Sequence, residues 1–210
     1  MKIDFISKVF RNKDIGIMGE NNEYRRYAVV IPIINIDGEL NVIFEVRSKN
    51  MRSQPGEISF PGGKVEEFES PEKASIRETC EELNIEEKQI NIIGQMDTLI
   101  TQHGKIIYPF IAEIDNKVTI KPSQTEVDHI FYVPLKFFME IKPIVKRIKV
   151  ISLPEEEFPY TDMEGAMGYN WDVGRHNVYF YRFKDYVIWG LTAKIIYYFI
   201  EELKINENFF

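Results

Sequence analysis

The chain has 210 residues, of which 44% are hydrophobic and 28% are charged. This balance is typical of a globular protein and excludes collagen, coiled-coil arrays and wholesale disorder, and the length favours a single domain over residues 1–210. The net charge of −7 at pH 7 argues against nucleic-acid binding, because that function needs a basic surface.

Cys80 is the single cysteine, so the chain cannot form a disulfide within itself. The first eight residues carry charges throughout and lack the continuous apolar stretch of a signal peptide. No run of about 18 apolar residues is present, so we expect no membrane span. These features together predict a cytoplasmic protein.

The first part of the chain combines a helical pattern with strand patterns that are separated by turn residues. In chain order we expect a short amphipathic helix over residues 2–10, a buried strand over 24–36, a hairpin turn at Asp37-Gly38, a returning strand over 40–46, and a loop over 47–63 that contains a short strand near 58–60.

The clearest helix covers Pro71 to Leu83. Ser70 can cap it, Pro71 suits its first turn, and Glu72 favours the helix dipole. The elements expected after it are strands near 90–101, 106–114 and 128–133, a short helix after Pro134, strands with a long aromatic loop over 145–183, and a helix over 185–204.

Three carboxylates share one side of the helix over residues 71–83. Each residue turns about 100°, so Glu82 lies about 40° to one side of Glu78 and Glu81 about 60° to the other. The apolar residues Ile76, Cys80 and Leu83 fall on the opposite side, which we expect to be buried. The three carboxylates form either a solvated acidic face or a site for a hard cation such as Mg²⁺, which prefers oxygen ligands.

The residues around this helix resemble the Nudix box. That motif reads Gly, Glu, Arg-Glu, Glu-Glu and Gly at fixed spacing, and the matching positions here are Gly63, Glu69, Arg77, Glu78, Glu81 and Glu82. Thr79 stands where an apolar residue is usual. Asn84 replaces the last Gly, and Asn is the next-best residue for the left-handed conformation that ends a helix.

The resemblance implies an α/β fold of the Nudix type, an α/β/α sandwich around a mixed β-sheet with N- and C-terminal helical extensions. Its core would cover about 24–140 and its C-terminal extension about 141–210. It also implies Glu78, Glu81, Glu82 and the Gly63 carbonyl as ligands of Mg²⁺ or Mn²⁺, and a pair of Glu69 with Arg77 that braces the loop. Glu81 and Glu82 are alternative general bases.

The stretch before the box resembles the extra motif of the coenzyme A diphosphatase branch of the family. The matching residues are Arg47, Ser48, Arg52, Gly56, Phe60, Pro61, Gly62 and Gly63, whereas Phe44, Glu45 and Val46 depart from that branch. Guanidinium groups fit phosphate, so Arg47 and Arg52 are candidate substrate ligands; the alternative is a surface salt bridge. The Gly62 backbone can approach a phosphate closely.

Two further acidic residues are possible members of the site. Glu57 is expected on the strand that leads into the box, either as a metal ligand or in an ion pair with an arginine. Glu126 occupies the loop position at which several Nudix enzymes carry a late catalytic or metal-binding Glu.

Two segments in the second half also look like this branch. They cover residues 131–135 and 188–193, and the second is expected to be helical and packed in the core. An aromatic cluster could form an adenine platform, although core or subunit packing is the simpler interpretation. Its members are Tyr160, Tyr169, Trp171, Tyr179, Phe180 and Tyr181.

The expected function is therefore metal-dependent hydrolysis of the diphosphate of coenzyme A or a derivative, with 4′-phosphopantetheine and adenosine 3′,5′-bisphosphate as products. Two alternatives stay open. One is a Nudix hydrolase of ADP-ribose, NADH or a nucleoside triphosphate, and the other is a non-catalytic nucleotide-binding Nudix domain. The expected partner is a small-molecule substrate, with no nucleic acid and no membrane, and a homodimer is possible.

Overall fold

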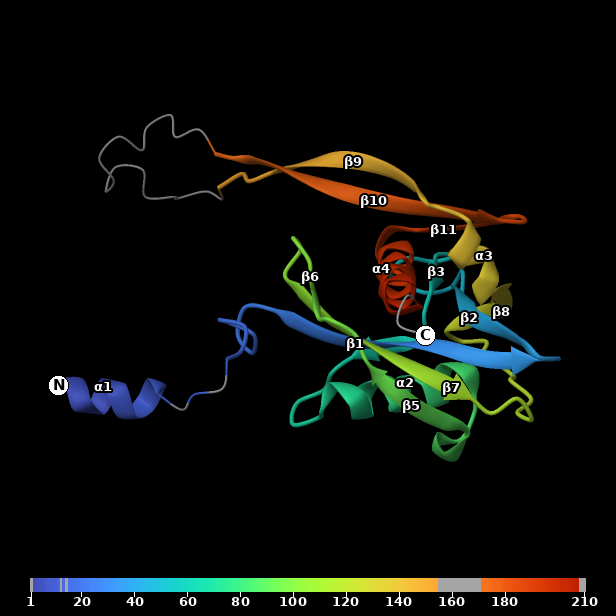
Figure 1. Ribbon diagram of the computed structural model, residues 1–210, viewed down its shortest axis with the longest axis horizontal. Coiled ribbons are helices and arrows are strands. Elements are labelled where there is room, and N and C mark those ends of the chain that lie inside the picture. The colour runs from blue at the N-terminus through green and yellow to red at the C-terminus, as the bar shows by residue number, and fades with distance from the viewer. Residues whose placement is uncertain (1, 12, 14, 155–170, 208–210) are drawn as a thin grey trace. The chain divides into compact units, whose positions relative to one another are not determined.

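The computed structural model describes residues 2–11, 13, 15–154 and 171–207 (Figure 1). Tyr160 and Tyr169 of the aromatic cluster lie outside the described residues. The chain forms two compact units, and strand β1 (Arg25–Ile36) contributes residues to both. The first unit holds residues 1–32 and 61–123, and the second holds residues 33–60 and 124–210.

The first unit consists of helices around a set of hydrogen-bonded strands. β1 pairs with β4 and neighbours β7, and β7 in turn pairs with β5 and β6. In addition to β1 its elements are α1 (Ile3–Phe10), β4 (Gly62–Lys64), α2 (Pro71–Leu83), the 3₁₀ turn η1 (Glu87–Gln89), β5 (Ile90–Gln95), β6 (Leu99–Ile100) and β7 (Lys105–Ile114).

Helix α2 is held against the strands of the first unit by a buried cluster. Ala74 of α2 belongs to it, together with residues of β1 and β7 and with Val65, which directly follows β4. Burial of these apolar side chains fixes the helix on the sheet, because removing apolar surface from water is the main favourable contribution to folding. The cluster comprises Ala28, Val65, Ala74, Ile106, Tyr108 and Phe110.

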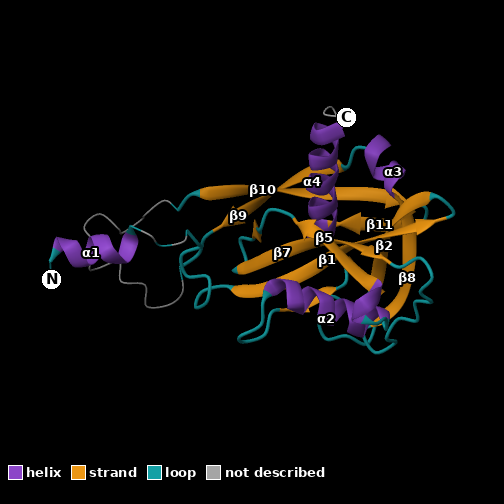
Figure 2. Cartoon of the chain, turned by 60° about the horizontal axis from the view of Figure 1, so that its bottom comes forward, coloured by secondary structure: helices purple, strands orange, loops and turns teal. Residues whose placement is uncertain are grey.

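The second unit contains a sheet around β2 and a separate three-stranded sheet. β2 pairs with β1, β3 and β8, and β10 lies between β9 and β11. Beyond β1 its elements are β2 (Glu39–Arg47), β3 (Ile58–Ser59), β8 (Val127–Pro134), α3 (Leu135–Glu140), β9 (Ile144–Ile151), β10 (Val173–Phe183), β11 (Tyr186–Trp189) and α4 (Gly190–Glu207), which Figure 2 colours by type.

The hairpin predicted between β1 and β2 is confirmed. Asp37 and Gly38 both adopt positive φ, at 51° and 88°, as a tight two-residue turn requires. Asn35 accepts a hydrogen bond from the Gly38 N–H through its side-chain oxygen at 2.9 Å. This turn sets the register in which Ile36 lies opposite Glu39.

The prediction of a helix over residues 185–204 is wrong for its first residues. Residues 186–189 form β11, which pairs with β10 so that Trp189 lies opposite Phe180. Lys184 and Gly190 have φ of 52° and 66°, so one residue turns the chain into the hairpin and the other separates strand from helix. Trp189 is therefore on a strand and half-exposed, rather than packed in a helical core.

The aromatic residues of this region that the structure describes pack mainly against one another. Tyr179 and Tyr181 are buried, and Tyr179 stacks on Tyr197 with ring centroids 4.8 Å apart. The Phe180 ring stacks on that of Trp189 at 6.2 Å. These contacts favour the packing interpretation of the cluster.

Candidate active site

Helix α2 begins and ends where its local sequence indicates. The Ser70 hydroxyl accepts a hydrogen bond from the Lys73 N–H at 3.3 Å, and Pro71 occupies the first position. Asn84 ends the helix in the left-handed conformation, with φ 53° and ψ 54°, and its N–H donates to the Cys80 carbonyl. Both predictions for the helix termini are confirmed.

Glu82 is buried rather than exposed, which corrects the predicted acidic face. Its side chain is 3% exposed, and its Oε2 accepts a hydrogen bond from the Gly62 N–H at 2.8 Å. The buried side of α2 also includes Thr79, whose hydroxyl donates to the Ser75 carbonyl, whereas Ile76 and Cys80 are only partly buried. The backbone of Gly62 therefore compensates for the burial of this carboxylate.

Gly63 makes room for the Glu78 carboxylate. A Cβ at Gly63 would overlap the Glu78 carboxyl group, so no larger residue fits without displacing it. At Gly62 a Cβ would meet the Ala28 carbonyl and the Val29 backbone, and φ is 150°. Both glycines are thus required by the close approach of β4 to β1 and α2.

Arg77 connects the acidic residues of the first unit. Its Nε and Nη2 donate to the two Glu69 oxygens at 3.0 and 3.1 Å, and its Nη1 donates to Glu78 Oε1 at 2.9 Å. Glu81 lies at 3.6 Å from Nη1, and the Lys64 carbonyl accepts from Nη2 at 3.2 Å. The structure therefore pairs Glu69 with Arg77 as the resemblance implies.

These contacts shift the protonation equilibria of both partners. The hydrogen bond from Arg77 is the main reason that the pKa of Glu69 lies below its ordinary value of 4.5. The hydrogen bond to Glu69 in turn raises the pKa of Arg77, with a further contribution from Glu78. Glu69 and Arg77 therefore both stay charged near neutral pH.

The oxygen atoms around α2 are of the types that a divalent cation accepts as ligands. Glu78, Glu81 and Glu82 supply carboxylate oxygens, Gly63 can supply a carbonyl oxygen, and magnesium and manganese both accept such ligands. The absence of a side chain at Gly63 lets the Glu78 carboxylate lie directly against the backbone of β4. In the residues that the structure describes, no three acidic, histidine or cysteine side chains are already gathered as a metal-holding group.

The second unit holds the arginines and the two additional glutamates. Arg47 ends β2, where its N–H donates to the Glu57 carbonyl and its carbonyl accepts from the Gly56 N–H. Next to it, the Ser48 N–H donates to the Glu126 carbonyl at 2.7 Å. The backbone therefore brings Arg47, Glu57 and Glu126 to the same end of β2.

The Nε atom of Arg47 is a buried hydrogen-bond donor without an acceptor among the described residues. Arg52 is exposed and has no ion pair within the described part of the chain. The alternative that these arginines form surface salt bridges is thus not supported by a partner among those residues.

The two extra glutamates differ from expectation in detail. Glu57 precedes β3 instead of lying on a strand, and its Oε2 accepts from Gln54 at 2.9 Å, not from an arginine. Glu126 is exposed and directly precedes β8. Their roles as metal ligands stay predictions.

Glu45 is a buried acidic residue that the sequence reasoning did not select. It is 1% exposed, and its Oε1 accepts a hydrogen bond from the Ser59 hydroxyl at 2.8 Å. It lies two residues before Arg47 on β2, and the pairing of β2 with β8 shifts register between Val46 and Arg47. The available signal was a single carboxylate inside the apolar run Val42–Val46, at a position that departs from the coenzyme A diphosphatase motif.

A sequence profile of the NUDIX domain matches residues 24–152, more than half of the chain. The chain belongs to the Nudix family. Its α/β fold is that of the family, as the resemblance predicted. The Nudix chain is accordingly a hydrolase that acts on a small-molecule diphosphate, and enzymes of this family use divalent metal ions. The predictions of the family and of an enzyme are confirmed.

Two relatives that share sequence with this Nudix chain are coenzyme A diphosphatases. A peroxisomal coenzyme A diphosphatase of Mus musculus is 27% identical over 173 residues, 80% of this chain and 72% of the relative. Another, from Caenorhabditis elegans, is 30% identical over 135 residues, 62% of this chain and 58% of the relative.

A bacterial relative covers more of both chains. An uncharacterized Nudix hydrolase of Photorhabdus laumondii is 28% identical over 189 residues, 90% of this chain and 89% of the relative.

Within the residues that the structure describes, no helix is long and apolar enough to cross a membrane.

Proposed function

We propose that this Nudix hydrolase cleaves the diphosphate of coenzyme A or of a coenzyme A derivative. The products would be 4′-phosphopantetheine and adenosine 3′,5′-bisphosphate, and the metal would be Mg²⁺ or Mn²⁺. The proposal includes a single Nudix domain over residues 1–210 and a cytoplasmic location.

The observation that carries the choice of substrate is the buried Arg47 Nε without a described partner. A buried guanidinium nitrogen without an acceptor is unfavourable, and a phosphate oxygen would satisfy it. Coenzyme A carries a diphosphate and a 3′-phosphate, so it offers an anionic group to each of Arg47 and Arg52. The motif that contains both residues continues without interruption into Gly63.

The relatives support the same substrate. Two of them are coenzyme A diphosphatases by name, at 27% and 30% identity.

The residues of the first unit suit the hydrolysis step. A divalent metal, when bound, neutralises the diphosphate and lowers the pKa of a bound water. Glu78, Glu81 and Glu82 would hold the metal, and Arg77 holds Glu69 and Glu78 in position. The Glu81 side chain is 60% exposed, so solvent reaches its carboxylate, whereas Glu82 Oε2 accepts a hydrogen bond from the Gly62 N–H. We therefore favour Glu81 as the general base.

The test compares three substrates in one assay. Coenzyme A, ADP-ribose and NADH are incubated separately with Mg²⁺, with Mn²⁺ and with a chelator, and the products are separated by anion exchange. We expect metal-dependent release of adenosine 3′,5′-bisphosphate from coenzyme A at a higher rate than cleavage of the other two. Faster cleavage of ADP-ribose or NADH would contradict the proposed substrate and retain the reaction class.

The arginine variant refines this test. Arg47→Ala should lower kcat/KM for coenzyme A by about ten- to a hundredfold, the value of a hydrogen bond to a charged group, and lower it less for ADP-ribose. Arg182→Ala is the matched control, because Arg182 is exposed on β10. An equal loss with all substrates would indicate a structural role for Arg47.

A further inference from the structure

Helix α1 presents an apolar face that no part of the described structure covers. Its side chains separate into two sectors at about 100° per residue. The apolar sector spans about 160° and contains Ile3, Phe5, Ile6, Val9 and Phe10. None of the α1 residues is buried, and Ile3 and Phe10 are 74% and 63% exposed.

The charge of this segment is opposite to that of the chain. Residues 2–13 contain four basic residues and one acidic residue, namely Lys2, Lys8, Arg11 and Lys13 with Asp4. The whole chain, by contrast, has a net charge of −7. Asp4 and Lys8 balance within α1 itself, so the positive charge lies at the two ends of the helix, at Lys2, Arg11 and Lys13.

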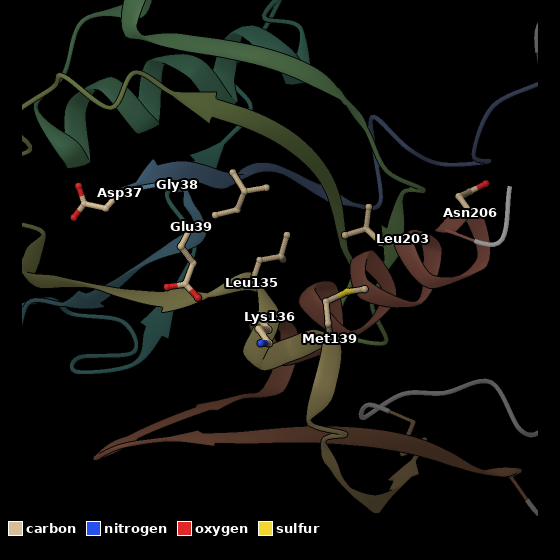
Figure 3. A pocket seen from close by; sticks show the side chains of 9 residues that line it. Asp37, Gly38, Glu39, Leu135, Lys136, Met139, Leu203 and Asn206 are labelled. Carbon is tan, nitrogen blue, oxygen red and sulfur yellow. The ribbon is translucent and has the colours of Figure 1, made fainter. Parts of the chain in front are cut away.

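The second unit contains an open groove of about 630 Å³ (Figure 3). Leu135, Met139 and Leu203 gather at its centre, and Asp37 and Glu39 lie to one side. Lys136 also lines the groove and lies 3.7 Å from the Glu140 carboxylate, so the lining holds two carboxylates and one ammonium group. The groove therefore combines an apolar floor with an acidic rim.

The groove is separate from the Arg47 end of the second unit. It lies at the start of β2, where Leu40 contributes to its lining, and Arg47 lies at the other end of the same strand. At about 3.3 Å per residue the two positions are about 23 Å apart. A phosphate bound by Arg47 would not occupy the groove.

We propose that the groove of one copy binds helix α1 of a second copy, in a reciprocal exchange that gives a dimer. The apolar sector of α1 would cover Leu40, Leu135 and Leu203, while Lys8 and Arg11 would face the acidic rim. An amphipathic helix in an apolar groove is a common recognition mode. The eight residues of α1 are about 12 Å long, and twofold symmetry makes both contacts identical.

An anionic lipid surface fits the same helix less well. The chain as a whole would be repelled by such a surface, because its net charge is −7. The acidic rim of the groove, by contrast, offers a protein surface of the right sign together with an apolar floor. Both features of α1 are matched by the groove.

The first experiment measures mass against concentration by sedimentation equilibrium. We expect a monomer–dimer equilibrium for the full chain. Ile6→Gln should raise the dimer Kd by about tenfold per contact, thus about a hundredfold for the two contacts, because Ile6 lies in the apolar sector. Ser7→Gln places the same side chain in the polar sector and should leave the Kd unchanged.

A mixing experiment then tests whether helix and groove touch. Leu40→Gln alters the groove at a half-exposed position and should weaken the dimer as Ile6→Gln does. A mixture of the two variants should dimerise more tightly than either variant alone. In the mixed dimer one helix–groove contact is unchanged and the other carries both substitutions, and two substitutions in one contact cost less than the sum of their separate effects.

Several outcomes would overturn the proposal. They are a monomer at all concentrations, a dimer that is insensitive to Ile6→Gln, and a mixture no tighter than its components. Binding to vesicles of phosphatidylserine by a protein that stays monomeric would assign α1 to lipid instead. All these measurements are independent of hydrolysis, so their failure is distinct from failure of the proposed substrate.

Discussion

At the scale of single residues, Arg77 determines the charge balance of the acidic helix. One guanidinium group contacts the carboxylates of Glu69, Glu78 and Glu81. Glu82 accepts a hydrogen bond from the backbone N–H of Gly62. Two of the proposed metal ligands, Glu78 and Glu81, are therefore in contact with Arg77 in the structure.

Glu69 gives this arrangement a measurable dependence on pH. Its pKa is lower in the folded protein than its ordinary value of 4.5, so its contribution to stability is fully present above about pH 4.5 and is lost as the pH falls through the lower, folded-state pKa. Glu69→Gln should lower the unfolding temperature at pH 7, and its difference from wild type should shrink below pH 4.5. Thermal unfolding measured from pH 3 to pH 7 provides the check.

The exposed neighbour Glu67 supplies the control for this experiment. Glu67→Gln should unfold at the wild-type temperature throughout the pH range. A difference between Glu69→Gln and wild type that stays constant down to pH 3 would refute the role of the Glu69 charge.

Glu82→Gln should remove most of the turnover while the protein remains folded. The substitution retains an oxygen acceptor for the Gly62 N–H but loses the negative charge, and we expect kcat to fall by about a hundredfold or more. Steady-state kinetics and the thermal unfolding curve are measured together, with Glu67→Gln as the control. Wild-type kcat in Glu82→Gln would rule out a catalytic or metal-binding role for this carboxylate.

The residues that were predicted well are those whose environment is local in sequence. Ser70 caps α2 and Asn84 ends it because each interacts within its own helix terminus. The burial of Glu82 was missed because its partner, Gly62, is 20 residues away in another element. Sequence spacing places the three glutamates on one arc of the helix, but it does not reveal which of them the adjoining strand covers.

At the scale of elements, the end of α2 depends on a single left-handed residue. Asn84 has φ of 53°. This conformation is unfavourable for most residues that have a Cβ, is tolerated better by Asn, and carries no such penalty for Gly. Asn84→Ala should lower the free energy of unfolding by about 1 kcal/mol, and Asn84→Gly should preserve it. Urea unfolding of the purified variants measures both.

Asn116 is the matched control for the helix terminus. It is exposed in a turn and is absent from the residues with positive φ in the described chain, so Asn116→Ala should change the free energy of unfolding very little. Equal destabilisation by the two alanine substitutions would contradict the explanation.

The strand β11 shows why another element was not predicted. The segment Tyr186–Trp189 is apolar and leads directly into a helix, so its pattern resembles the first turn of that helix. Its pairing with β10 is a contact across a hairpin, and the turn at Lys184 uses a positive φ that lysine rarely adopts. Short apolar runs are ambiguous between strand and helix for this reason.

At the scale of the whole molecule, binding of metal should be visible as a gain in stability. A ligand present at a hundred times its Kd stabilises the folded state by about 2.7 kcal/mol, which corresponds to an increase of about 5–10 °C in Tm for a chain of this length. Mn²⁺ or Mg²⁺ should therefore raise the Tm, and a chelator should reverse the change. Differential scanning calorimetry is the measurement.

The variant for this measurement is Glu78→Gln, with Glu67→Gln as the control. Glu78→Gln should reduce the increase in Tm because it removes a proposed ligand, while Glu67→Gln should show the full increase. An identical response of both variants would exclude Glu78 as a ligand. This readout does not depend on the identity of the substrate.

The thiol of Cys80 offers a chemical probe of helix α2. It is the one thiol of the chain, it is partly buried, and it directly precedes Glu81. Burial is the main reason that its pKa is raised, and Glu87 and Glu81 add to the effect, so little reactive thiolate exists while α2 is in place. Cys80 should therefore react slowly with an alkylating reagent in the native protein, and faster under conditions that loosen α2, without any engineered label.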